Sequence, residues 1–210
     1  MKNIAKAAEL PSLTEWRAQN PTDYENYPDK DALRVALSSE QRGICCYCMQ
    51  RIRPQRDSMK IEHWKSHRNY PQLRLVYSNL LGACIGGEGY RKKDQHCDTF
   101  KGDADLCRNP ADATHNIEIR IRYLSDGTIE ATDQLFNEHL NTVLNLNLPF
   151  LKANRKAVLD GFKRFLGLRA GKIKPEIWQK LLQQWDGDGH AGELEEYAGV
   201  VSYWIRKHLR

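Results

Sequence analysis

The sequence predicts an α+β fold, and three observations lead to this prediction. Six cysteines are confined to the stretch between positions 45 and 107. Residues 117–132 alternate apolar and polar side chains around an Asp-Gly turn, which predicts a β-hairpin. The segments on either side carry apolar side chains at helical spacing. We therefore expect helices at both ends of the chain, with a cysteine-rich core and a small hairpin between them.

Length, composition and charge limit the class of protein. A chain of 210 residues with 40% hydrophobic and 28% charged residues is typical of a globular protein. The 32 Lys and Arg exceed the 27 Asp and Glu, so the net charge of +5 permits a polyanionic partner without requiring one. No run of 18 apolar residues is present, and the start, MKNIAKAAEL, lacks the apolar stretch of a secretory signal. We therefore expect a cytoplasmic protein with no membrane partner.

The first segment, residues 1–44, is predicted to be polar and helical. Leu33, Val35 and Leu37 lie among good helix formers between positions 31 and 41. Gly43 follows at the position where a helix commonly ends.

Residues 45–110 form the predicted core, because they hold all six cysteines. Clustered cysteines in a cytosolic chain more often bind a metal than form disulfides. Cys45 and Cys48 form a Cys-x-x-Cys turn whose two sulfurs can bind one Zn²⁺ ion, and Cys84 and Cys97 are the natural further ligands. Zinc held in this way would stabilise the fold rather than take part in catalysis. Two other cysteines stay open as alternative ligands: Cys46 and Cys107.

Residues 111–132 are predicted to form the hairpin. Its first strand has apolar side chains at every second position: Ile117, Ile119, Ile121 and Tyr123. A Ser-Asp-Gly turn at 125–127 leads into the second strand over residues 128–132.

Residues 133–210 are predicted to be helical. Apolar periodicity marks four helices, at 135–144, 151–166, 175–185 and 194–209. Gly167 and Gly171 are expected to end the second helix, and residues 186–192 are expected to form a loop. We interpret the aromatic side chains of this region as core residues: Phe162, Phe165, Trp178, Trp185, Tyr197 and Trp204.

An acid and an imidazole stand side by side between the two cysteine pairs. Glu62 and His63 lie at the centre of residues 60–67, and alone they are equally compatible with a surface acid beside a structural histidine. Their context makes them candidates for catalysis, because Asn79 precedes Cys84 and Asp98 follows Cys97. The plain alternative for the asparagine is a turn or helix-cap residue.

These elements, in this order, resemble the HNH (ββα-metal) endonuclease family, whose core is two strands and a helix around a catalytic metal. The matching motifs over residues 43–103 are Cys-x-x-Cys, Glu-His, Asn-Leu-x-x-x-Cys and Cys-Asp-x-x-Lys. The flanking motifs Leu-x-x-x-Leu-Ser-Ser-Glu-Gln-Arg-Gly-Ile-Cys and Lys-Gly-Asp are similar to PtuB-type HNH subunits of Septu and retron-associated anti-phage defence systems. The resemblance implies a metal-dependent nuclease that hydrolyses phosphodiester bonds.

Phosphodiester hydrolysis assigns a role to each candidate residue. His63 is suited to remove a proton from the attacking water near pH 7. Glu62 and Asp98 supply the carboxylates that Mg²⁺ or Mn²⁺ prefers. In the family, the residue corresponding to Asn79 binds backbone near the catalytic histidine and holds its loop.

The chain departs from the common family pattern at two points. Twelve residues separate Cys84 from Cys97, where most members have two. Asp98 stands where the final histidine or asparagine of the pattern is expected, so Asp103 and His96 stay open as alternative ligands of the catalytic metal.

Basic residues are concentrated around the same motifs. Residues 41–70 contain seven Lys and Arg against two Asp and Glu, which favours contact with phosphates over a merely solvated face. The candidate nucleic-acid-binding residues are Arg51, Arg53, Arg56, Lys60, Lys65 and Lys101.

The resemblance also implies partners. It implies an ABC/SMC-like ATPase subunit (PtuA), and a retron reverse transcriptase with its msDNA in the retron-associated systems. Residues 133–210 are expected to dock such a partner, and the substrate, DNA or RNA, stays open. Two other functions remain: a zinc-stabilised nucleic-acid-binding module without catalysis, and a stand-alone toxin or restriction HNH nuclease.

Overall fold

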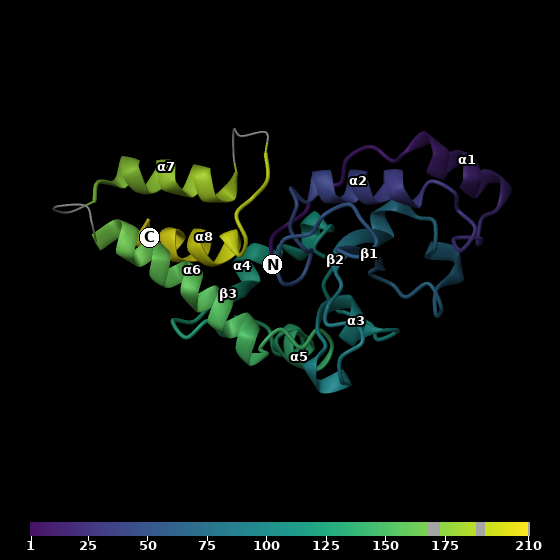
Figure 1. The fold of residues 1–210 in the computed structure, drawn as a ribbon. Helices are drawn as coiled ribbons and strands as arrows, with labels where there is room; N and C mark the ends of the chain where they lie inside the picture. The colour runs from purple at the N-terminus through teal and green to yellow at the C-terminus, as the bar shows by residue number, and fades with distance from the viewer. Residues whose placement is uncertain (168–172, 188–191, 210) are drawn as a thin grey trace.

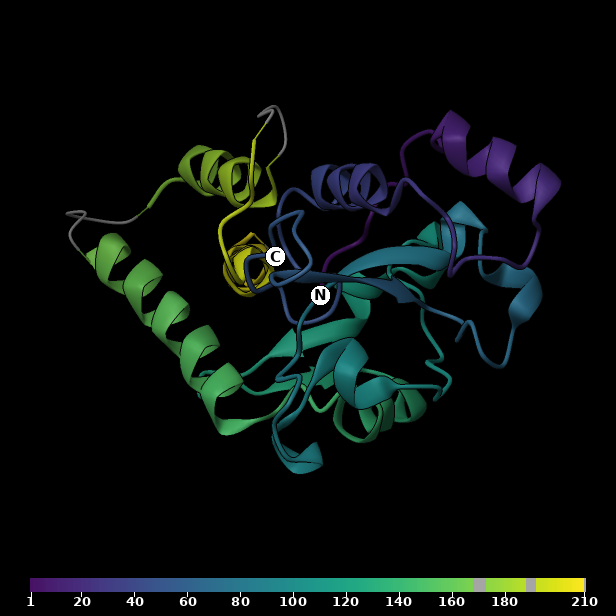
Figure 2. The same cartoon turned by 45° about the vertical axis from the view of Figure 1, so that its right-hand side comes forward.

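The computed structural model describes residues 1–167, 173–187 and 192–209, and it combines helices with two small antiparallel sheets (Figure 1). The expected α+β class is confirmed at this level. Both views place the last three helices together at one end of the molecule and the first two helices at the other (Figure 2). Within the described ranges, no helix combines the length and hydrophobicity that a membrane crossing needs.

The N-terminal segment contributes two helices, α1 (Pro11–Gln19) and α2 (Lys30–Glu40). Leu33 and Leu37 of α2 are fully buried, whereas Val35 is 55% exposed because it lies on the opposite face. The chain leaves α2 through Gly43, which has a φ of +73° and donates its N–H to Ser38. This is the predicted helix end, since glycine adopts a left-handed conformation without strain.

The central part of the chain forms a strand pair followed by a short helix. Strands β1 (Met59–His63) and β2 (Leu80–Cys84) are antiparallel, with Met59 opposite Cys84 and His63 opposite Leu80. Helix α3 (Cys97–Lys101) follows the loop after β2 and packs against that strand. In both views α2 lies above the pair and α3 below it.

The predicted hairpin is shorter than expected. Strands β3 (Ile121–Tyr123) and β4 (Ile129–Ala131) pair around the Asp-Gly turn, but residues 117–120 form a helical turn, α4 (Ile117–Arg120), instead of a strand. Ile119 is consequently 72% exposed. The pairing stops because the opposite chain turns away after Thr132, where the Asp133 carboxylate accepts the N–H of Phe136 and begins the next helix.

The C-terminal region contains α5 (Gln134–Thr142), α6 (Pro149–Gly167), α7 (Pro175–Asp186) and α8 (Ala198–His208). The first three agree with the predicted helices, but the last begins at Ala198 rather than at residue 194. Residues 192–197 instead run beside the first cysteine loop (residues 42–51), where Leu194 and Tyr197 donate their N–H groups to Arg42 and Met49. Gly171 and most of the predicted loop at 186–192 lie outside the described residues.

Two apolar clusters fill the interior. The larger one extends from the N-terminal segment through both sheets to the start of α8. The smaller one joins α6, α7 and α8 through Phe162, Trp178, Leu181, Val201 and Ile205. The interpretation of the aromatic residues as core holds for all but Phe165, which is 43% exposed.

Candidate metal centre and the neighbouring pocket

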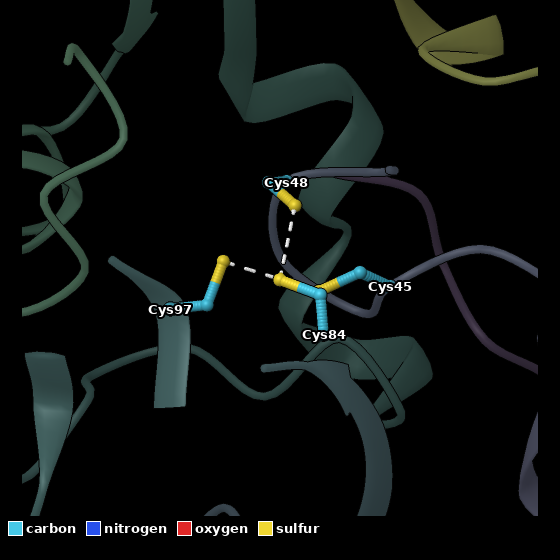
Figure 3. Close-up of side chains that lie close together, drawn as sticks. All are labelled: Cys45, Cys48, Cys84 and Cys97. Atoms are coloured by element: carbon cyan, nitrogen blue, oxygen red, sulfur yellow. Dashed lines mark hydrogen bonds between the residues drawn. The ribbon is translucent and has the colours of Figure 1, made fainter. Parts of the chain in front are cut away.

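Four cysteines from distant parts of the chain lie together in the centre of the molecule. Cys45 and Cys48 belong to the first cysteine loop, Cys84 ends β2, and Cys97 begins α3. Their sulfur atoms point toward one another (Figure 3) and all lie within 4.8 Å of each other. Cys97 is held there with a φ of +54°, a conformation that residues other than glycine adopt only where the surroundings enforce it.

The spacing of the sulfurs fits a tetrahedral ion. At a Zn–S distance of about 2.3 Å, the sulfurs of a tetrahedral site lie roughly 3.8 Å apart. The Sγ atoms of Cys45 and Cys97 are 3.9 Å apart, and those of Cys48 and Cys84 are 3.6 Å apart. All six cysteines are free thiols, which excludes disulfides. The four buried cysteines could therefore hold a metal such as zinc.

Electrostatics favours a cation at this position. Burial and the neighbouring sulfurs raise the pKa of the Cys97 thiol well above its ordinary value. Four thiolates crowded together without a cation would be strongly disfavoured, whereas a bound Zn²⁺ stabilises all four in the deprotonated form.

The alternative cysteines do not join this group. Cys46 is buried beside it and donates its N–H to Gly82, and Cys107 is partly exposed elsewhere. His96 lies next to the group, with its Nδ1 3.1 Å from the Cys97 sulfur. This position puts His96 beside the cysteines and not in the pocket described next.

A pocket of about 280 Å³ lies beside β1 and α3. It is lined by residues of β1, α3, the loops that follow each of them and the loop before α2, and we call it the acid–histidine pocket. Its lining includes Glu62, His63, His67, Asp98 and Asp103. The structure thus brings the predicted acid, imidazole and second acid to one cavity.

His63 is fixed in one orientation. Its Nε2 lies 3.0 Å from the carbonyl oxygen of Arg74, and because a carbonyl only accepts, Nε2 carries the proton. The ring stacks on His67 at 5.0 Å and meets the edge of Tyr24 at 4.5 Å. Burial lowers the pKa of His63 to about 4. At neutral pH the ring is therefore uncharged, and its Nδ1 is left with a lone pair.

Asn79 holds the loop that orients His63. Its side-chain amide donates to the carbonyls of Lys65 and Leu73, at 3.0 and 3.1 Å, and its Oδ1 accepts the N–H of Lys65 at 2.8 Å. Leu73 immediately precedes Arg74, whose carbonyl binds the histidine. The side chain therefore links two points of the segment that connects β1 and β2 rather than capping its own short helical turn, and one of these points adjoins the carbonyl that binds His63.

Glu62 is completely enclosed. Its Oε1 accepts a hydrogen bond of 2.6 Å from the Tyr47 hydroxyl and lies 3.1 Å from the Lys101 ammonium. Burial and the charge of Asp98 raise the pKa of Glu62 well above its ordinary value. A cation beside Glu62 would offset both its burial and the repulsion from Asp98, and so would stabilise the ionised form of Glu62.

Asp98 and Asp103 differ in their partners. The Asp98 side chain faces the pocket, and Lys60 approaches it at 3.9 Å. Asp103 also lines the pocket, but its carboxylate already binds the Ser66 hydroxyl and lies 3.5 Å from Arg68. Asp98 is therefore the better placed of the two to act together with Glu62.

The predicted nucleic-acid-binding residues differ in their surroundings. Lys101 is not on the surface, since it is 3% exposed and enclosed against Glu62. This corrects the expectation that it contacts phosphates, and the reason is that a buried carboxylate requires a charged partner. Arg51 and Arg53 turn toward the segment at 192–197, where they bind the Leu194 carbonyl and the Glu193 carboxylate.

Apart from Lys101, all the basic candidates, Arg51 and Arg53 included, keep part of the side chain accessible. Lys60 lines the pocket and pairs with Glu88 at 3.0 Å, and Lys65 lies over Trp64 and pairs with Asp105 at 3.0 Å. Arg56 is exposed.

Sequence reasoning missed three contributors to this pocket: Tyr47, the carbonyl of Arg74 and the buried role of Lys101. No pattern pairs position 47 with position 62, because the contact depends on how the first cysteine loop folds over β1. A scan of protein-family models finds no match to the chain, and a search of curated proteins finds no similar sequence. The chemistry of the site therefore has to be inferred from its geometry.

Proposed function

We propose that this protein is a metal-dependent HNH-type endonuclease that hydrolyses phosphodiester bonds of nucleic acid. The observation that carries this proposal is the fixed neutral His63 beside Glu62 and Asp98 in one pocket. The order of elements supports it, since two antiparallel strands and a short helix bear these residues. The cysteine centre, at the other end of the same elements, would hold a structural Zn²⁺.

Each side chain has a defined task in the proposed reaction. The Nδ1 lone pair of His63 accepts the proton of the attacking water, while the Arg74 carbonyl stabilises the imidazolium that forms. Glu62 and Asp98 would hold a Mg²⁺ or Mn²⁺ ion, which when bound neutralises the scissile phosphate and the departing oxygen. Lys60 at the pocket and exposed Arg56 are placed to attract the phosphate backbone without reading bases.

The experiment is a cleavage assay of the purified protein on plasmid DNA and on tRNA with Mg²⁺ or Mn²⁺. We expect His63→Ala to reduce the rate by about 10²–10⁴-fold, since a general base contributes that much. His208→Ala is the control, because this histidine stacks on Trp178 at a remote site. Cleavage by His63→Ala at the wild-type rate would refute the assignment and make His67 the next candidate base.

A second function has one observation in its favour. Lys101 already neutralises Glu62, an arrangement that a purely structural ion pair would also show. A zinc-stabilised nucleic-acid-binding module predicts binding without cleavage under every metal condition. The same assay, combined with a gel-shift measurement, distinguishes the two functions.

The proposed cellular role is supported by the sequence resemblance alone. We place the nuclease as the effector subunit of a prokaryotic anti-phage defence system that acts with an ABC/SMC-like ATPase, in some systems beside a retron reverse transcriptase and its msDNA. Co-purification with an ABC/SMC-like ATPase of this kind, with Lys207→Glu as the surface variant, tests whether the C-terminal helices dock such a partner.

A further inference from the structure

The contacts around Glu62 connect the cysteine centre to the acid–histidine pocket. Tyr47, between two of the cysteine ligands, donates its hydroxyl to Glu62 Oε1 at 2.6 Å. Lys101, four residues after Cys97, lies 3.1 Å from the same oxygen. Each of these three side chains is almost entirely removed from solvent. The two donors therefore come from separate segments, the first cysteine loop and α3, and converge on one oxygen atom.

The way these donors share Glu62 has a geometric consequence. Both contacts fall on Oε1, and a carboxylate held by two donors at one oxygen cannot rotate about its terminal torsion. Lys101 is itself fixed, because its ammonium also donates to the carbonyl of His63 at 3.0 Å. The second oxygen, Oε2, takes part in neither contact, and Glu62 lines the acid–histidine pocket together with Asp98.

We propose that Tyr47 is a positioning residue that fixes Glu62, so that Glu62 and Asp98 together hold one divalent cation. This inference rests on the proposed function and specifies how its cation site is built. Lys101 supplies the positive charge that balances the Glu62 carboxylate. Tyr47 supplies a neutral donor that orients this carboxylate without repelling the cation. The hydroxyl acts only through Glu62 and does not touch the substrate.

The chain offers a matched control for this hydroxyl. Tyr77 is also a buried tyrosine whose hydroxyl binds a carboxylate, Glu40, at 2.9 Å. Neither residue of that pair lines the pocket or contacts Glu62, so Tyr77→Phe removes the same chemical group from the same kind of contact at another carboxylate. Any difference in Mn²⁺ affinity between Tyr47→Phe and Tyr77→Phe therefore depends on which carboxylate has lost its hydroxyl partner.

The experiment measures Mn²⁺ affinity by electron paramagnetic resonance in the zinc-loaded protein, without nucleic acid. We expect one Mn²⁺ site in the wild type, weakened about 10–100-fold in Tyr47→Phe, since removing the partner of a metal-binding side chain has an effect of this size. Tyr77→Phe should bind Mn²⁺ as the wild type does, and all three proteins should contain one zinc. Cleavage by Tyr47→Phe should recover as Mg²⁺ is raised.

The possible results are separable. Equal Mn²⁺ affinity in Tyr47→Phe and wild type overturns the role of Tyr47 and leaves the proposed nuclease intact. Loss of zinc from Tyr47→Phe also overturns it, because the hydroxyl would then support the cysteine centre rather than Glu62. Absence of any Mn²⁺ site in the wild type removes the cation site itself, and with it both this inference and the proposed catalysis.

Discussion

The two halves of this molecule are stabilised in different ways. The region at 43–103 encloses polar and ionisable side chains, among them Glu62, His63, Asn79 and Lys101, each with a fixed partner. The helices α6, α7 and α8 instead pack against one another through an apolar cluster around Phe162 and Trp178. Apolar burial is non-directional and tolerates small shifts, whereas buried polar groups need their partners at defined distances.

This difference accounts for where a metal would be needed. The regular structure of the 43–103 region is a two-stranded sheet, a five-residue helix and short 3-10 turns, too little to hold two distant loops together. A metal bound by the four cysteines would join those loops directly and fix the starting point of α3, which also bears Asp98. The C-terminal helices need no such ion, because their apolar faces cover one another.

The largest expected effect comes from removing the cysteine ligands. A variant with Cys45→Ser and Cys48→Ser should lose zinc and unfold, because structural zinc contributes roughly 10–16 kcal/mol and a typical domain is stable by about 5–15 kcal/mol. Metal analysis and far-UV circular dichroism measure both properties. Cys107→Ser is the control and should keep its zinc, since Cys107 lies outside the group. A double variant that is folded but contains no zinc would show that the 43–103 region does not depend on a metal for its stability.

An intermediate effect is expected in the apolar cluster. Phe162→Ala should lower the free energy of unfolding by about 3–5 kcal/mol, because it leaves a cavity next to Trp185. Its zinc content should stay unchanged. Phe165→Ala removes a side chain that is 43% exposed, so it should lower the free energy of unfolding by clearly less. Urea unfolding with metal analysis tests this, and a loss of zinc in Phe162→Ala would mean that the two regions are not independent.

The smallest effect concerns an ion pair between the C-terminal helices and the N-terminal segment. Asp186, at the end of α7, lies 2.8 Å from Lys2. Burial opposes its ionisation, but the charges of Lys2 and Arg206 outweigh this and lower its pKa. A carboxylate with a lowered folded-state pKa stabilises the fold above its unfolded pKa of about 3.9, and this stabilisation is lost as the pH falls.

Asp186→Asn should therefore lower the free energy of unfolding by about 1–3 kcal/mol at pH 7. The difference in the free energy of unfolding between wild type and variant should narrow below about pH 4, where wild-type Asp186 becomes protonated. Urea unfolding at several pH values measures this. Asp160→Asn removes an exposed pair with Lys156 and serves as the control. A gap that does not change with pH would show that the aspartate does not act through its charge.

The sequence allowed the four cysteine ligands to be predicted, because their spacing is imposed by the geometry of a small ion. Glu62, His63 and Asn79 could be proposed only in the context of those cysteines. The burial of Lys101 could not be foreseen, since a lysine in a basic segment has no local signal that pairs it with an acid 39 positions earlier. The helical turn at 117–120 was not predicted, because apolar and polar side chains also alternate in a segment whose partner strand is too short to pair with it.

The start of α8 was predicted too early for a related reason. Residues 194–197 have an apolar pattern that a helix would share, but they bind the first cysteine loop instead. Contacts between positions so far apart in the chain are decided by the tertiary fold and not by local propensity.

The strap formed by residues 192–197 has a consequence for how the protein is made. A nascent chain has all four sulfurs once residue 97 has left the ribosome, but Tyr197 reaches the Met49 carbonyl only after another 100 residues. At about 5–20 residues per second, this interval lasts roughly 5–20 seconds. During that time the first cysteine loop lacks the two backbone hydrogen bonds that Leu194 and Tyr197 donate to it. We expect that loop to be held in its final position only after the end of the chain has been synthesised.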